Sequence, residues 1–132
     1  MLRARPSALV PPDEVKCARF DRLTDRRIVR CLRALRGGVL ITTRPALNLL
    51  SARFTDASVV RVGQEHLHYA HHKPALAQEI DHWYAKLDAL TVLNEADLRV
   101  YADRLAGGGV RSSASPTRSP TPPRPARRCA GR

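Results

Sequence analysis

Short apolar runs alternate with amphipathic segments along the middle of the chain. Three runs rich in β-branched and aliphatic residues, at 39–43, 58–62 and 88–93, are typical of buried strands. Between them, apolar residues recur every three or four positions, as they do on one side of a helix. Strands joined by helices of this length form a parallel sheet through right-handed crossovers. The pattern therefore predicts an α/β fold in which a small, three-stranded parallel sheet is flanked by helices.

Four helices are expected, and local residues indicate where three of them begin. Thr24 is placed to cap a helix over 25–36, Pro45 to open a helix that continues to Phe54, and Asn94 to cap a helix that ends near Leu105. Another helix, over 74–87, has the clearest apolar stripe in the chain. That stripe comprises Leu76, Ile80, Trp83, Tyr84 and Leu87.

Both ends of the chain differ in composition from this middle part. Residues 1–23 contain three prolines and no regular pattern, so we expect them to be poorly structured. From residue 107 onward Ser, Pro, Arg, Ala and Thr dominate without periodicity, which predicts a disordered tail over 107–132. One folded region, 24–106, is therefore expected. The tail is either a functional basic segment or the product of a shifted or premature end to a longer gene.

The positive charge lies mainly outside that expected folded region. The formal net charge of +11 divides into +6 over residues 1–36, −1 over 37–106 and +6 over 107–132. A folded part that is nearly neutral argues against specific nucleic-acid binding. Five arginines lie on the first helix, and they form either a solvated face or a surface that meets an acidic membrane or an anionic polymer.

The cysteines and the lengths of the apolar runs indicate in which cellular compartment the protein is expected. The three cysteines are scattered and form no CxxC pair, which favours a reducing environment. No apolar run approaches the roughly 18 residues that a membrane span requires. The first residues also lack the apolar core of a signal peptide. We therefore expect a cytoplasmic protein.

The segment after the second expected strand carries the densest set of reactive side chains. Gly63 interrupts the apolar run, and Gln64, Glu65, His66 and His68 follow it directly. In open parallel sheets, ligands bind beyond the carboxyl ends of the strands. Three interpretations stay open: a site that contacts a sugar or a phosphate, a solvated loop, and a metal site built from His66 and His68.

A second candidate lies where the first expected strand meets its helix. Thr43 and Arg44 stand just before Pro45, so a hydroxyl and a guanidinium would lie beside a helix N-terminus, where anions bind. The alternative is a capping threonine followed by a surface arginine. The chain contains no Walker loop, GxGxxG, GxSxG or HExxH motif, so nothing in the sequence indicates nucleotide binding by this part.

Three segments together resemble the N-terminal lobe of bacterial GT-B glycosyltransferases of the group 1, or family 4, type. These segments are residues 38–48, 59–66 and 83–97. The resemblance implies a partial Rossmann-like lobe that binds the acceptor, facing a second lobe that holds the nucleotide sugar. It also implies a catalytic histidine after the second strand, matched best by His66 and otherwise by His68. On the acceptor side it implies contacts from Thr43, Arg44, Glu65 and His68.

The resemblance further implies that the donor lobe is missing, so we expect no sugar transfer by this chain alone. A nucleotide sugar would bind only together with that C-terminal lobe. The expected acceptor is a glycan or a molecule resembling a polyol phosphate, and no metal or other cofactor is expected. The alternative to an acceptor lobe is a small basic binding module for an anionic polymer or a membrane surface.

Overall fold

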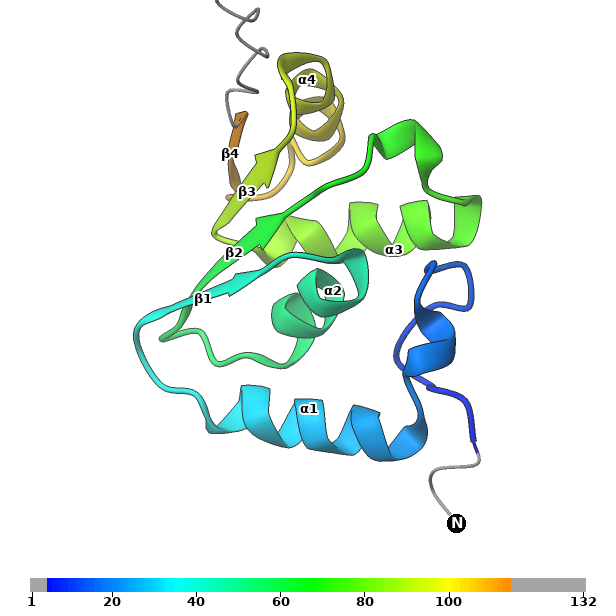
Figure 1. Cartoon of the computed structure of the whole chain (residues 1–132). Helices are drawn as coiled ribbons and strands as arrows, with labels where there is room; N and C mark the ends of the chain where they lie inside the picture. The colour runs from blue at the N-terminus through cyan, green and yellow to red at the C-terminus, as the bar shows by residue number, and fades with distance from the viewer. Residues whose placement is uncertain (1–4, 115–132) are drawn as a thin grey trace, which may run out of the picture.

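Four parallel strands form one sheet in the computed structural model, which describes residues 5–114 of the chain (Figure 1). The strands lie side by side in chain order, and each pair of neighbours is parallel. The expected α/β class with a small parallel sheet is therefore confirmed. The strands are β1 (Val39–Thr42), β2 (Val60–Gln64), β3 (Ala89–Val92) and β4 (Arg111–Ala114).

The fourth strand, β4, lies in the segment that was expected to be disordered. Arg111 pairs with Ala89 and Ala114 with Val92, so β4 continues the sheet beyond β3. The prediction of three strands was wrong because Arg-Ser-Ser-Ala has no apolar alternation, and the free edge of β3 supplies its backbone partners. The expectation of disorder over 115–132 falls outside the described residues.

Helices α2, α3 and α4 lie on the same side of the sheet (Figure 1). This follows from the strand order, because successive right-handed crossovers that move in one direction place their helices on one face. Helix α1 packs against α2. Within the described residues, the helices are α1 (Arg22–Ala34), α2 (Pro45–Phe54), α3 (Pro74–Trp83) and α4 (Glu95–Arg104), and the short 3-10 helices are η2 (Cys17–Arg19), η3 (Tyr69–His71) and η4 (Tyr84–Lys86).

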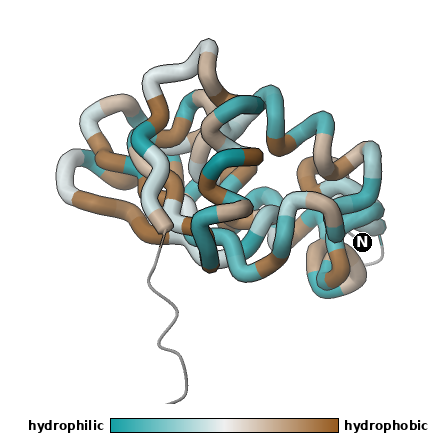
Figure 2. Tube along the Cα trace, turned by 90° about the horizontal axis from the view of Figure 1, so that it is seen from above, coloured by the Kyte–Doolittle hydropathy of each residue, from teal (hydrophilic) through white to brown (hydrophobic). Residues whose placement is uncertain are grey.

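The other face of the sheet is apolar on β1 and β2, and its side chains are exposed. Val39, Ile41 and Val60 are 65%, 56% and 46% exposed, and the strand register places them on one face, since Val39 pairs with Val60. In Figure 2, β1 is the continuous hydrophobic stretch at the left edge of the molecule. Parallel sheets usually have both faces covered, so this exposed strip is unusual for the architecture.

The first helix begins earlier than its sequence suggested. Asp21, not Thr24, is its N-cap, and the Asp21 carboxylate accepts bonds from both the backbone N–H and the hydroxyl of Thr24. Asp25 in the first turn is buried and accepts bonds from the Ser7 hydroxyl and the Ala8 N–H, at 2.6 and 2.9 Å. These contacts attach residues 5–21, which were expected to be poorly structured, to α1.

The sequence suggested that Gly63 ends the second strand. In the structure Gly63 lies inside β2, which continues to Gln64. A Cβ atom on this residue would lie 2.9 Å from Cδ1 of Leu87, 3.2 Å from Cδ1 of Leu90 and 3.3 Å from Cγ of Asn48. Glycine is therefore needed for close packing between β2 and the layer beneath it. Because β2 continues to Gln64, the side chain of Glu65 is the first to follow the strand.

Helix α3 ends at Trp83, and η4 covers the rest of the expected helix. The aromatic residues at the centre of the core are Tyr84 and Tyr101, which are fully buried and stacked with ring centroids 6.4 Å apart. Trp83 is half-buried at the margin of this cluster. The apolar stripe thus predicted the inward side of the helix but not which of its aromatic residues is buried most deeply.

Candidate functional site

Polar residues gather where three neighbouring strands end. Thr43 and Arg44 follow β1, the segment 65–68 follows β2, and the segment 94–97 follows β3. The register aligns these ends, since Thr42 pairs with Gly63 and Gln64 pairs with Thr91. This carboxyl edge of the sheet is the position at which open α/β sheets bind ligands.

His68 and Asp97 form the closest polar pair at this edge. Nδ1 of His68 lies 2.6 Å from Oδ2 of Asp97, and the two residues come from different strand ends, 29 positions apart in the sequence. The histidine side chain is half exposed, whereas that of Asp97 is buried. Because an aspartate oxygen accepts from Nδ1–H, the bond orients the ring and leaves Nε2 as the basic nitrogen.

The N-terminus of α4 fixes the position of Asp97. Asn94 is the N-cap, its side-chain oxygen accepts from the Asp97 N–H at 2.9 Å, and its amide nitrogen donates to Oδ2 of Asp97 at 3.0 Å. The backbone N–H of Tyr69 also donates to Asp97, at 3.3 Å. The carboxylate thus accepts two hydrogen bonds besides that from His68, and the backbone N–H of Asp97 makes a third bond to Asn94, so the pair is preorganised.

A buried polar network lies beneath the exposed residues of the edge. Asn48 of α2 donates to Oε1 of Glu65 and to the Tyr84 hydroxyl, each at 3.1 Å, and accepts from the Thr42 hydroxyl at 2.6 Å. Tyr84 donates a further hydrogen bond to the same Glu65 oxygen. The network joins β1, α2, the end of β2 and η4, so it holds the strand ends in register.

Glu65 is buried with only part of its carboxyl group satisfied. Oε2 accepts no hydrogen bond within the described residues and lies 3.7 Å from Nε2 of His72, which in turn is 3.1 Å from the Tyr101 hydroxyl. Burial raises the pKa of Glu65 to about 7, although the bonds from Tyr84 and Asn48 oppose the rise. Burial also lowers the pKa of His72 and raises that of Tyr84.

Replacing Glu65 with glutamine is expected to change how stability depends on pH. Because the folded state raises the pKa of Glu65 from 4.5 to about 7, it binds the proton more tightly than the unfolded state. The carboxyl group therefore favours folding fully below pH 4.5 and loses that effect as the pH rises through 7. Relative to the native chain, Glu65→Gln should gain about 3 kcal/mol between pH 4.5 and pH 8.

Urea denaturation at several pH values measures this difference. His72 has a lowered pKa, so it reduces stability toward acid in both proteins, and the difference between them removes most of its effect. A difference between Glu65→Gln and the native chain that stays constant from pH 4.5 to pH 8 would contradict the raised pKa.

The five residues expected to form the site occupy different environments. His66, Thr43 and Arg44 are exposed; Arg44 is the N-cap of α2, but its side chain makes no capping bond. His68 is half exposed and paired with Asp97, whereas Glu65 points into the buried network. Within residues 5–114, His66 makes no hydrogen bond or ion pair. The geometry thus brings together His68, Asp97 and Asn94, with Glu65 beneath them.

Sequence reasoning did not include Asp97, Asn48, Tyr84 or His72 in the site. Asp97 was noted only as an acidic residue near a helix start, and Tyr84 only as part of an apolar stripe. A signal was present for Asp97, because Asn94 and His68 follow adjacent strands of a parallel sheet, and such ends meet at one edge. Nothing in the sequence distinguishes Asn48 from an ordinary polar helix residue.

Two further structural findings concern metals and membranes. Within residues 5–114, no three His, Cys, Asp or Glu side chains come close enough together to hold a metal ion. In the same part of the chain, no helix has both the length and the apolar character needed to cross a membrane.

Comparison with known proteins gives one informative relationship. The chain is 33% identical over 128 residues to a protein of Streptomyces coelicolor named as an exopolysaccharide phosphotransferase. The match covers 94% of this chain but only 13% of that much longer protein. No model of a protein family matches the chain, and no solved structure matches it.

Proposed function

We propose that this chain forms the acceptor-side lobe of a GT-B-type enzyme that transfers a sugar from a nucleotide sugar to a glycan. The observation that carries the proposal is the His68–Asp97 pair at the carboxyl edge of the parallel sheet. Similarity to a protein named as an exopolysaccharide phosphotransferase supports a reaction in which a glycan takes part. The donor nucleotide would be held by another part of the enzyme.

In this proposal His68 acts as a general base toward the acceptor. A hydroxyl of the glycan donates its proton to Nε2, while Nδ1–H remains bonded to Asp97, and the acceptor oxygen forms the new bond as the donor's leaving group departs. A buried carboxylate beside an imidazole stabilises the imidazolium that this proton transfer produces. Asp97 is therefore a positioning residue for His68.

The remaining residues of the edge would bind the acceptor around His68. Arg44 and Thr43 lie at the end of β1 and are exposed, so a guanidinium and a hydroxyl are available to sugar hydroxyls or to a phosphate on the acceptor. His66 is exposed on the loop after β2, which also carries His68. That His66 contacts the transferred sugar stays a prediction. Glu65 would support the loop from below through its bonds to Tyr84 and Asn48.

Binding of the proposed acceptor class can be tested on the full chain. We expect short neutral oligosaccharides and their phosphorylated forms, screened by calorimetry, to include a ligand for the native chain. His68→Ala and Asp97→Asn should weaken that binding about tenfold or more, because each removes or misorients a polar contact.

Glu95→Gln is the matched control, because Glu95 is also in the first turn of α4 but is exposed and, within residues 5–114, forms an ion pair only with Arg99. It should bind the same ligand as tightly as the native chain. If no member of the screen binds, or if Glu95→Gln and Asp97→Asn weaken binding equally, the assignment of the acceptor site is wrong.

A further inference from the structure

A groove with a cavity volume of about 980 Å³ runs along α1, apart from the carboxyl edge of the sheet. Helix α1, the N-terminal segment and Phe54 at the end of α2 form its walls. None of its lining residues belongs to the His68–Asp97 pair or to the network beneath it. The groove is therefore a second candidate binding site. Its arginines are Arg5, Arg22, Arg26, Arg30 and Arg33.

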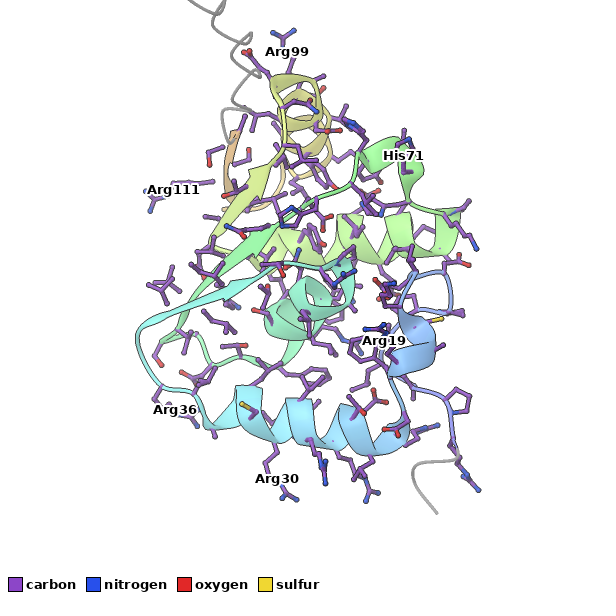
Figure 3. All side chains as sticks on the ribbon, viewed as in Figure 1. Arg19, Arg30, Arg36, His71, Arg99 and Arg111 are labelled. Carbon is purple, nitrogen blue, oxygen red and sulfur yellow. The ribbon has the colours of Figure 1, made fainter. Side chains whose placement is uncertain are left out.

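Four of the five arginines follow the helical repeat. Arg22, Arg26, Arg30 and Arg33 are separated by four, four and three residues, so they share one side of α1. A rise of 1.5 Å per residue places the Cα atoms of successive arginines about 4.5–6 Å apart along the axis. Arg5 joins them, since its backbone oxygen accepts from the Arg22 N–H at 3.1 Å. Figure 3 shows Arg30 projecting outward from α1.

The positive charge of the groove exceeds the negative charge of its own lining. In the described part of the chain, none of its five arginines forms an ion pair with a carboxylate. Asp25 is the acidic residue among the described lining residues, and its carboxylate is bonded to Ser7 and Ala8. A row of unpaired guanidinium groups in a concave surface is suited to a chain of phosphate groups.

The apolar and aromatic residues of the lining argue against a membrane surface and against a nucleic acid as the ligand of the groove. The apolar residues, which include Leu9, Val29 and Phe54, line a hollow and do not protrude from a convex surface, so a flat bilayer does not fit them. Arg33 and Arg53 lie over the Phe54 ring, 5.5 and 5.2 Å from its centroid. The ring is thus already covered by cations and is a poor platform for a stacked nucleic-acid base.

We propose that this groove binds an extended polymer of polyol or sugar units linked by phosphodiesters, with the α1 arginines on successive phosphates. A polyol spacer separates phosphates by a distance similar to the axial spacing of about 4.5–6 Å between successive arginines, whereas adjacent phosphates of inorganic polyphosphate lie closer together. The proposal does not depend on the activity of the His68–Asp97 site. It is tested by binding alone, without any sugar donor.

The test measures binding of a fluorescent oligomer of glycerol phosphate, about eight units long, to the full chain by anisotropy. Arg26→Glu/Arg30→Glu should weaken binding by about 30-fold or more and reduce its salt dependence, because two phosphate contacts become repulsive. Arg19→Glu/Arg27→Glu is the matched control: it changes the net charge equally, at exposed positions that do not line the groove. It should weaken binding no more than about threefold, the residual effect of charge at a distance.

Circular dichroism establishes whether each variant is folded. If the charge reversals unfold the chain, the neutral double variants Arg26→Gln/Arg30→Gln and Arg19→Gln/Arg27→Gln replace them. Inorganic polyphosphate, a single-stranded oligothymidylate of equal charge and vesicles containing phosphatidylglycerol are the competing probes. The proposal predicts that the glycerol phosphate oligomer binds tightest. Tighter binding of any competing probe, equal loss in both double variants, or no binding of the oligomer at low salt would overturn it.

Discussion

Replacing Asn48 with alanine is expected to lower the free energy of unfolding by about 3–5 kcal/mol. Asn48 is fully buried and bonds to the Thr42 hydroxyl, the Gln64 carbonyl, the Glu65 carboxyl and the Tyr84 hydroxyl. Alanine would strand several of these groups away from water and leave a void where the amide was. A loss of this size is a large fraction of the stability of a small domain.

The neighbouring turn of the same helix provides the control for this substitution. Ser51 is as deeply buried as Asn48, but its hydroxyl has no hydrogen-bond partner within residues 5–114. Ser51→Ala should therefore leave stability unchanged or raise it slightly, because it removes an unsatisfied polar group. Urea denaturation followed by circular dichroism measures both variants. A loss below about 1 kcal/mol for Asn48→Ala would show that the network does not stabilise the strand ends.

Replacing His68 with alanine is expected to reduce the rate of sugar transfer by about 10²- to 10⁴-fold in the enzyme to which this lobe is proposed to belong. The substitution removes the group that would accept the acceptor's proton. Stability should change by less than about 1 kcal/mol, because Asp97 keeps its bonds to Tyr69 and Asn94. The combination of lost turnover and retained stability separates a catalytic role from a structural one.

Substitutions at two other histidines test whether the loss of sugar-transfer activity is specific to His68. His66→Ala tests the residue that the sequence resemblance favours as catalytic, and His82→Ala is a control on α3, where the side chain is exposed and contacts Trp83. We expect His82→Ala to keep full activity and His66→Ala to reduce it less than His68→Ala does. A fully active His68→Ala enzyme together with an inactive His66→Ala enzyme would return the catalytic role to His66.

Most of the fold could be predicted because apolar spacing reports directly on secondary structure. The start of α2 at Pro45 and the cap of α4 at Asn94 agree with the local residues, since each signal acts within one turn of helix. The errors occur where long-range packing decides the outcome. Gly63 stays within β2 because it pairs with Thr42 of β1 and Leu90 of β3, and β4 forms because β3 has a free edge.

The candidate site could be predicted only in part for the same reason. The loop after β2 was identifiable from its dense polar residues and its place after a buried strand. Which of its side chains point outward depends on the network around Asn48, which turns Glu65 inward, and on α4, which supplies Asp97 to His68. Both contacts join residues that are at least 17 positions apart in the sequence, so no local pattern reveals them.

The most direct test of the central claim maps the acceptor site on the native chain by NMR. Amide resonances are followed while an oligosaccharide identified by the calorimetric screen is added. The account predicts that the shifted resonances cluster at the carboxyl edge of the sheet, in residues 43–44, 65–68 and 94–97, and that Asp97→Asn weakens the effect. Shifts confined to the α1 groove or to the exposed strip of β1 and β2, with none around His68, would contradict it.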